Sequence, residues 1–274
     1  MRPVEERLRE LLPDGRIHVL ENTRFDPRET QNDEGYARDL ARGCDLYVDD
    51  AFGSVHRVHA SVEAVAHVLP AYAGLLLERE LDELGKLLGD VEHPFVLVSG
   101  GAKVEDKLGV LQQLGGKADT VLVGGKMAEE MRAENPLDFP VVLPTDVVAA
   151  AAFDADAEAR VAPYDALPDG WLGLDIGPET RAAFAEHVSR ARTIFWNGPM
   201  GVFEWPRFAE GTKAVAEAVA SARAFSVVGG ADSARALTEL GLEHSVSWLS
   251  TGGGAALELL EGKDLPGVAA IPEA

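Results

Sequence analysis

The sequence predicts an α/β protein: a doubly wound, parallel-sheet domain preceded by the remainder of an N-terminal α/β domain, with a helix joining the two. Three observations support this fold class. Short, continuous apolar runs recur along the chain, as is typical of strands buried on both faces of a parallel sheet. Helical patterns lie between several of these runs. Most of the runs end in glycine or a small polar residue, and open α/β sheets bind ligands at the carboxyl ends of their strands.

The first part of the chain, residues 1–72, contains two such runs, at 17–20 and 46–48, with a helical pattern over 33–42 between them. Two parallel strands alone do not form a stable sheet, because both faces and both edges need cover. We therefore expect residues 1–72 to be the remainder of a domain whose beginning is absent. The alternative is that this segment docks on the large domain as a lobe.

A helix is predicted next, within residues 73–90. Leu77, Leu81, Leu84 and Leu88 are spaced by three or four positions, which places them on one helix face. No Pro-rich or Ser-rich linker lies nearby, so this helix is predicted to connect the domains.

Residues 91–255 alternate strands with helices and are predicted to form the doubly wound domain. Val215 and Val219, four apart, mark a helix over residues 208–222. Residues 256–274 are expected to return toward the N-terminal domain. The predicted strands are residues 95–98, 120–123, 141–143, 171–176, 193–196, 225–228 and 246–249.

Composition excludes several classes of protein. A net charge of −21 argues against general binding to nucleic acid or to anionic membranes. The longest clean apolar run, residues 147–153, is too short to span a bilayer, and the charged start lacks the apolar core of a signal peptide. Cys44 is the one cysteine, so no internal disulfide framework or cysteine-based zinc site is expected. We expect a soluble cytoplasmic protein in which Cys44 is buried and inert.

The glycine loops at the predicted strand ends indicate a phosphate ligand. Glycine lets a backbone approach a phosphate closely, and the N–H groups of the helix that follows donate to it. The doubly wound domain is therefore predicted to bind a nucleotide; glycines that merely turn the chain are the alternative. The motif G-x-x-x-x-G-K-[ST] is absent, so this is not a P-loop protein. No G-x-G-x-x-G follows a predicted strand, which makes a nicotinamide-dependent dehydrogenase the weaker hypothesis.

The sharpest motif runs from Gly100 through Lys103 to Lys107. On a helix, two lysines four apart share a face, so both ammonium groups would reach a polyphosphate. The alternative is two solvated lysines on an ordinary helix. Lysine is unfavourable at the positive end of a helix unless an anion compensates it, which favours a functional role.

Two further loops carry groups for phosphoryl chemistry. Asp232, after Gly229 and Gly230, is placed to hold Mg²⁺ on a nucleotide, and an N-cap role at a helix near Ser233 is a compatible alternative. The backbone N–H groups of residues 252–254 offer a nest for a transferring phosphoryl group.

Two histidines lie close in the sequence to two aspartates, a combination that could suggest a metal site. His56 and His59 near Asp49 and Asp50 are predicted to serve packing or phosphate contact rather than to bind a metal.

Taken together, these motifs resemble phosphoglycerate kinase over nearly the whole chain. The resemblance rests on residues 20–25 (LENTRF), 50–59 (DAFGSVHRVH), 100–107 (GGAKVEDK), 173–178 (GLDIGP), 196–204 (WNGPMGVFE), 229–233 (GGADS), 250–255 (STGGGA) and 259–269 (LLEGKDLPGVA).

The resemblance implies two domains that close around the reactants and transfer a phosphoryl group in glycolysis. The reactants would be 1,3-bisphosphoglycerate and MgADP, and the products 3-phosphoglycerate and MgATP. Residues 1–72 would then be the remainder of the substrate-binding domain. The partners would be these small molecules, without nucleic acid or membrane, and the chain would be a monomer.

Site residues carry over from the resemblance by position. Lys103 and residues 252–254 would be catalytic, Arg24 and Arg57 would bind 3-phosphoglycerate, and Asp232 would bind Mg²⁺. The catalytic glycines are Gly252, Gly253 and Gly254. The nucleotide-binding set would be Gly101, Ala102, Lys103, Lys107, Gly125, Gly173, Leu174, Asn197, Pro199, Val202, Glu204, Gly229, Gly230, Ala231, Asp232 and Ser233. Within it, Gly173, Leu174, Pro199 and Val202 would line the adenine pocket, and Glu204 would bind the ribose.

The chain also departs from the family pattern. The family's opening segment, with further substrate ligands and an arginine, is missing. Ala231 stands where glycine is usual, Lys126 stands where glycine or alanine is usual, and residues 129–139 replace a longer helical insert. Two hypotheses follow: an active enzyme, or a nucleotide-binding remnant that transfers phosphoryl groups poorly.

Overall fold

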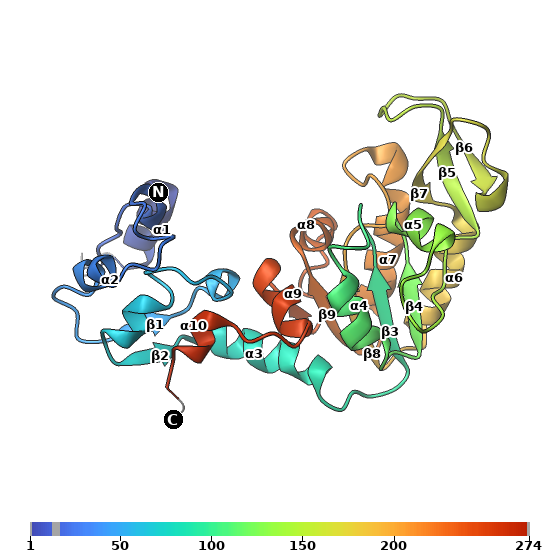
Figure 1. The fold of residues 1–274 in the computed structure, drawn as a ribbon. Coiled ribbons are helices and arrows are strands. Elements are labelled where there is room, and N and C mark those ends of the chain that lie inside the picture. The colour runs from blue at the N-terminus through green and yellow to red at the C-terminus, as the bar shows by residue number, and fades with distance from the viewer. Residues whose placement is uncertain (1, 13–16, 273–274) are drawn as a thin grey trace. The chain divides into compact units, whose positions relative to one another are not determined.

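The computed structural model describes residues 2–12 and 17–272, with side chains from residue 6 onward. The chain divides into two compact units, Met1–Leu77 with Asp264–Ala274, and Glu78–Lys263. Figure 1 traces the elements of both units.

The smaller unit holds a two-stranded parallel sheet in which Tyr47 pairs with Ala71. A small core of alanine and valine side chains packs beside it, including Ala37 and Val65. The C-terminal segment belongs to this unit, where Gly267 N–H donates to the carbonyl oxygen of Val55 at 2.8 Å. Its elements are α1 (Arg2–Leu11), α2 (Glu34–Leu40), β1 (Tyr47–Asp49), β2 (Ala71–Ala73) and α10 (Pro266–Ala269).

The prediction of a strand at residues 17–20 is wrong. These residues form no regular structure, and Leu20 is 62 % exposed. No neighbouring strand is present among the described residues to take their backbone hydrogen bonds. The parallel partner of β1 is instead β2, a short Ala-Tyr-Ala segment that carries no apolar run.

The predicted helix within residues 73–90 is confirmed as α3 (Leu75–Leu88). Asp50 accepts from the N–H groups of Leu76 and Leu77 at 2.7 and 3.1 Å and so caps its start. The boundary between the two units falls inside this helix, after Leu77. Its buried face is Leu77, Leu84 and Leu87, together with one acidic residue, Glu80.

The larger unit is built on a five-stranded parallel sheet in the order β10-β9-β8-β3-β4. Every residue of β3 and β8 is buried. Successive side chains of a strand point to opposite faces, so both faces of this sheet are covered. The strands are β3 (Phe95–Ser99), β4 (Thr120–Val123), β8 (Thr193–Asn197), β9 (Phe225–Gly229) and β10 (Trp248–Leu249). The apolar runs predicted at these positions are confirmed, as is the α/β fold class.

Helices cover the sheet and complete its core. Trp196 of β8 is fully buried in a cluster with Phe184 of α6 and with Val215 and Val219 of α7, as the helical pattern over 208–222 predicts. The helices are α4 (Leu108–Gly115), α5 (Met127–Ala133), α6 (Pro178–Ser189), α7 (Glu210–Ser221), α8 (Ala231–Glu239) and α9 (Gly254–Leu260).

A second sheet of the larger unit is antiparallel, and the sequence does not predict it. It has the order β6-β5-β7, with β5 (Asp146–Ala150), β6 (Ala159–Pro163) and β7 (Leu172–Ile176). The run at 171–176 is a strand, as predicted, but it pairs antiparallel with β5 and does not belong to the parallel sheet. The run at 141–143 is no strand: Pro140 and Pro144 flank it, and one isolated bridge joins Val142 to Leu122.

Cys44 is exposed, which corrects the prediction that it is buried. It follows Gly43, which has a φ of 81°, in the turn between α2 and β1. Its backbone N–H donates to the carbonyl oxygen of Ala41 at 3.0 Å. The turn therefore directs the side chain away from the small core of this unit.

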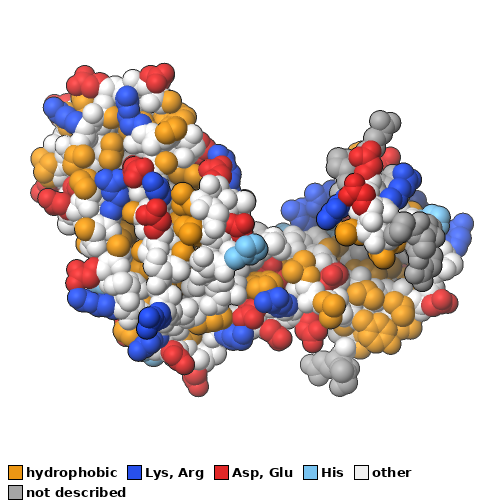
Figure 2. Space-filling model, turned by 180° about the vertical axis from the view of Figure 1, so that it is seen from behind, with side chains coloured by type: hydrophobic (Ala, Val, Ile, Leu, Met, Phe, Trp, Pro, Cys, Tyr) orange, Lys and Arg blue, Asp and Glu red, His pale blue; other side chains and the backbone are white. Residues whose placement is uncertain are grey.

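The surface carries both signs of charge. On the face drawn in Figure 2, acidic and basic side chains of the larger unit are interspersed. Within the described part of the chain, no helix combines the length and the apolar character needed to cross a bilayer.

We expect the backbone amides of β1 and β2 to exchange hydrogen faster than those of β3 and β8. The described β1–β2 pair has no third strand beside it, whereas β3 and β8 each have two strand neighbours in a buried sheet. Hydrogen exchange followed by mass spectrometry measures this difference. Equal or slower exchange in β1 and β2 would contradict it.

Candidate functional site

The loops that follow the parallel strands meet at the carboxyl edge of the five-stranded sheet. Gly100 N–H, after β3, donates to the carbonyl oxygen of Asn197 at 3.0 Å. Gly125 N–H, after β4, donates to the carbonyl oxygen of Met200 at 3.0 Å. Lys103, Asn197, Asp232 and Gly253 each end or follow a different strand of this sheet, as the sequence predicts.

Glycine is required where these loops touch. A methyl group at Gly198, which has a φ of 97°, would lie 2.2 Å from the carbonyl oxygen of Gly100. One at Gly125 would lie 2.8 Å from the carbonyl oxygen of Gly101. Gly101 and Gly253 also have positive φ, but a methyl group there would meet nothing within 4 Å. The first pair packs the loops together, and the second pair leaves open space beside the backbone.

The two motif lysines do not share a helix face, which corrects the prediction. Residues 101–107 form bends and turns, and α4 begins only at Leu108 with Lys107 as its N-cap residue. The turn is closed by Lys107 N–H, which donates to the carbonyl oxygen of Val104 at 3.0 Å. Because Lys103 lies in this loop, its ammonium group is not part of the first turn of α4, where the helix dipole is positive.

The two ammonium groups differ in environment. Lys103 is exposed and lies 3.0 Å from a carboxylate oxygen of Glu105. Lys107 is partly buried, and burial lowers the pKa of its ammonium to about 8, against the opposing effect of Asp232 and Asp106. A buried cation with this pKa would gain stability from an anionic ligand beside it.

Asn197, at the end of β8, and Ser233, in the first turn of α8, are buried beneath the carboxyl edge of the sheet and form the buried floor of the site. The Ser233 hydroxyl oxygen accepts from Gly198 N–H at 2.7 Å and so ties the loop after β8 to α8. Asn197 is 3 % exposed, and its Oδ1 has no hydrogen-bond partner among the described residues. An unsatisfied buried polar atom indicates that another group completes the site.

Asp232 lies in the first turn of α8, and Gly230 is the N-cap residue, which corrects the suggested N-cap role of Asp232. Its carboxylate is exposed and has no hydrogen bond or ion pair within the described ranges. α8 has no side-chain cap, so its first N–H groups remain available to an anion. One free carboxylate beside such an anion suits Mg²⁺, which binds one or two carboxylates together with phosphate oxygens.

The loop at residues 251–254 is held by a residue that sequence reasoning missed. Glu80 of α3 is fully buried and accepts from Trp248 Nε1 at 2.8 Å, from Thr251 N–H at 2.7 Å and from the Thr251 hydroxyl at 3.0 Å. A glutamate on the leucine face of α3 was the sequence signal for this contact. Its three hydrogen bonds fix the backbone just before Gly252 and Gly253.

The residues assigned to the adenosine end come from the second sheet and the loop after β8. Val202 N–H donates to the carbonyl oxygen of Leu174 at 2.8 Å, which joins the two segments. Gly173 and Pro199 are partly buried and Glu204 is exposed, so all three are accessible to a ligand.

Behind this segment lies Asp175, a buried carboxyl group that sequence reasoning also missed. Its Oδ2 accepts from Gly211 N–H at 2.7 Å, whereas Oδ1 has no partner among the described atoms. A methyl group at Gly201 would lie 2.5 Å from Oδ1. Burial raises the pKa of Asp175 from 3.8 to about 7.

The two substrate arginines lie in the smaller unit. Arg24 belongs to the 3₁₀ helix Thr23–Phe25, which Asn22 caps by accepting from Arg24 N–H at 3.0 Å. Arg57 N–H donates to the carbonyl oxygen of Ser54 at 2.9 Å. Both side chains are exposed, and in the described part of the chain neither guanidinium has a hydrogen-bond or ion-pair partner.

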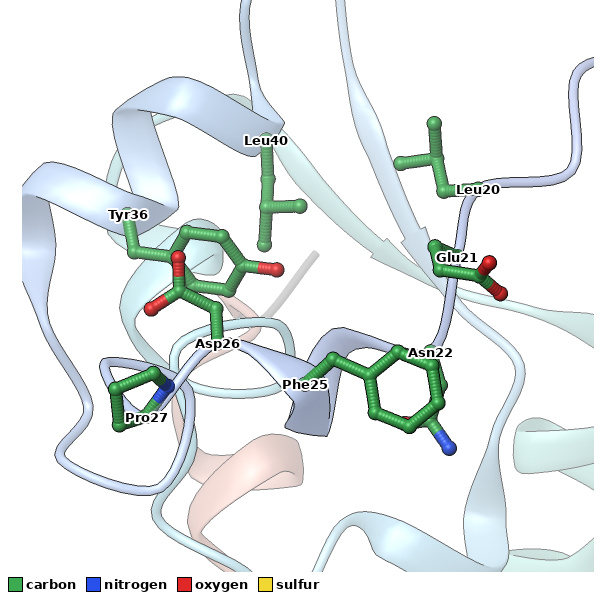
Figure 3. A pocket seen from close by; sticks show the side chains of 8 residues that line it. All are labelled: Leu20, Glu21, Asn22, Phe25, Asp26, Pro27, Tyr36 and Leu40. Atoms are coloured by element: carbon green, nitrogen blue, oxygen red, sulfur yellow. The ribbon is translucent and has the colours of Figure 1, made fainter.

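A pocket of about 490 Å³ is lined by residues that flank Arg24 in the sequence, including Asn22 and Phe25 (Figure 3). Figure 3 shows Tyr36 and Leu40 of α2 on one side and Leu20 and Glu21 on the other. Its lining is apolar and acidic and contains no basic side chain, so it does not suit an anionic substrate.

His59 lies in the same unit as these arginines, with Nδ1 3.8 Å from a carboxylate oxygen of buried Glu29. Glu29 also accepts from Ser61 N–H at 3.0 Å. The described residues contain no group of three or more potential metal ligands.

The raised pKa of Asp175 makes stability depend on pH. Because the folded-state pKa of about 7 lies above the reference value of 3.8, the carboxyl contributes stability below 3.8 and loses it as pH rises through 7. We expect wild-type protein to lose roughly 2–3 kcal/mol more than Asp175→Asn between pH 5 and pH 8. Urea unfolding at the two pH values measures this, and equal losses would contradict the assignment.

Comparison with known proteins identifies the family of this chain. The family model described as phosphoglycerate kinase matches residues 2–139 and 131–263, two stretches that overlap in the segment where the sequence departs from the family. A phosphoglycerate kinase of Herpetosiphon aurantiacus is 49 % identical over 282 residues, covering 94 % of this chain and 72 % of that protein. One of Roseiflexus castenholzii is 50 % identical over 295 residues, covering 98 % and 74 %.

Solved structures show the same fold. Phosphoglycerate kinase from Coxiella burnetii superposes with a TM-score of 0.80 at 38 % identity, covering 92 % of this chain and 72 % of that one. The enzyme from Pyrococcus horikoshii superposes with a TM-score of 0.82 at 29 % identity, covering 98 % and 81 %. With a family model over most of its length and relatives near half identity, the chain belongs to the phosphoglycerate kinase family.

Proposed function

We propose that this protein transfers a phosphoryl group between 1,3-bisphosphoglycerate and MgADP, giving 3-phosphoglycerate and MgATP in glycolysis. The observation that carries the proposal is the meeting of the loops after β3, β8 and β9 at one sheet edge. Lys107, the free carboxylate of Asp232 and the uncapped start of α8 gather there. Cations and backbone donors gathered in this way bind a nucleotide's phosphates.

The nucleotide would lie along this edge. Lys103 and Lys107 would bind its phosphates, with Gly101, Ala102, Gly229, Gly230, Ala231 and Ser233 supplying the surrounding backbone. Asp232 would hold Mg²⁺, which when bound neutralises charge on the phosphate oxygens. Gly173, Leu174, Pro199 and Val202 would line the adenine pocket, Glu204 would bind the ribose, and Asn197 would face the phosphates. Gly125 would be a further member of the nucleotide-binding set.

The backbone at Gly252, Gly253 and Gly254 would stabilise the transferring phosphoryl group. Gly253 is the N-cap residue of α9 and α9 has no side-chain cap, so the N–H groups of Gly253 and Gly254 are available to an oxyanion, whereas Gly252 N–H donates to the Ser250 hydroxyl at 3.2 Å. Glu80 holds Thr251 rigidly, which orients those donors before the reactants arrive. Phosphoryl transfer depends mainly on such positioning and charge stabilisation.

Arg24 and Arg57 would bind 3-phosphoglycerate. An exposed guanidinium without a competing carboxylate can form two parallel hydrogen bonds to a phosphate or carboxylate. We further propose that the protein is a cytoplasmic monomer.

The alternative is nucleotide binding without turnover. The resemblance assigns two arginines, Arg24 and Arg57, to the substrate and none to the transferring group. The loss of one arginine that stabilises transferring charge can cost about 10³–10⁵ in rate.

We expect Lys103→Ala and Asp232→Ala each to weaken MgADP binding about tenfold to a hundredfold, because each removes a charge-assisted contact. Isothermal titration calorimetry measures the dissociation constants. Cys44→Ser is the control, since Cys44 is exposed and lies in the other unit. Unchanged affinity in both charge variants would refute the nucleotide assignment.

Both hypotheses predict binding of MgADP, but they differ in turnover: the active enzyme should turn over at a typical kinase rate of about 1–100 s⁻¹, and the alternative far more slowly. A coupled assay of the purified chain measures turnover. A rate within that range would support the active enzyme and eliminate the alternative.

A further inference from the structure

The loop that carries Lys103 and Lys107 has no regular structure of its own and is held by the segment that follows β4. Met127 N–H donates to the carbonyl oxygen of Gly101 at 3.2 Å. Gly125 approaches Gly101 so closely that it has no room for a side chain.

A side chain of α5 adds a further attachment. Val104 N–H donates to Glu130 Oε2 at 2.9 Å. Val104 is itself buried, so its side chain anchors the middle of the loop while Glu130 fixes the peptide that joins it to Lys103. Glu130 therefore acts on the backbone between the two lysines.

We propose that Glu130 is a positioning residue of the nucleotide site: its carboxylate fixes the Lys103–Val104 peptide so that the two lysines are held where they meet the phosphates. The proposal rests on the proposed function of this edge. Glu130 lies at the start of residues 129–139, the segment that stands in place of a longer helical insert.

The carboxylate has two opposing effects, and they can be separated. As a hydrogen-bond acceptor it orders the loop, which favours binding of the phosphates. As a negative charge it repels them, and it also acts on Lys103, whose pKa Glu105, Asp106 and Glu130 together raise. If positioning dominates, removing the acceptor weakens binding, whereas removing only the charge does not.

Three variants test this with MgADP as the ligand. Glu130→Ala removes acceptor and charge, and Glu130→Gln keeps an acceptor while removing the charge. Glu129→Ala removes an equal charge from the neighbouring position, where the described residues show no hydrogen bond to the side chain. Calorimetry gives the dissociation constants, and NMR hydrogen exchange at the Val104 amide reports the loop without ligand.

We expect Glu130→Ala to weaken MgADP binding about fivefold to thirtyfold and to speed exchange at Val104. Glu130→Gln and Glu129→Ala should bind at least as tightly as wild type, with Val104 still protected. Unchanged binding in Glu130→Ala, or equal weakening in Glu130→Ala and Glu130→Gln, would overturn the proposal.

Failure of the proposed nucleotide site at this edge would give a different result. Wild-type protein would then not bind MgADP at all, while exchange at Val104 would still report whether Glu130 orders the loop. Protected exchange at Val104 in Glu130→Ala would overturn the positioning role regardless of any ligand.

Discussion

The site depends on the close approach between the loops that follow β3 and β8. Gly100 N–H donates to Asn197, and Gly198 lies against the Gly100 carbonyl with no space for a side chain. The same stretch receives Ser233 from α8, and a methyl group at Gly198 would lie 3.2 Å from Lys107 Nζ. Any residue larger than glycine at position 198 would separate the lysine, the α8 start and the buried floor of the site.

Buried or bonded carboxylates hold these loops from behind. Glu80 fixes Thr251, Asp175 lies under Gly201 and caps Gly211, and Glu130 holds Val104. Each of these carboxylates accepts a hydrogen bond from a backbone N–H group. It therefore stabilises the conformation of a loop and does not contact the ligand. A protein with a net charge of −21 thus supports an anion-binding surface with acidic side chains. The lysines are left to face outward.

The sequence predicts the parallel sheet well because its strands are continuous apolar runs ending in glycine, as at residues 95–98 and 225–228. The sequence-based prediction fails where an apolar run does not reveal the direction in which its strand pairs. Residues 171–176 have the same composition as a parallel strand, but pairing direction depends on Val147–Ala150, a partner that composition does not reveal. Glu80 and Asp175 were missed because their roles arise from burial against distant backbone. The spacing of Lys103 and Lys107 predicts a shared helix face, because spacing alone does not reveal the hydrogen bond from Val104 N–H to Glu130.

A crystal structure of the protein with MgADP would show directly where the nucleotide binds. We expect its phosphates to lie against residues 100–107 and the start of α8, with Mg²⁺ bound to Asp232 and the adenosine beside Leu174 and Val202. A nucleotide bound away from the carboxyl edge of the five-stranded sheet, or one whose metal does not contact Asp232, would contradict this expectation.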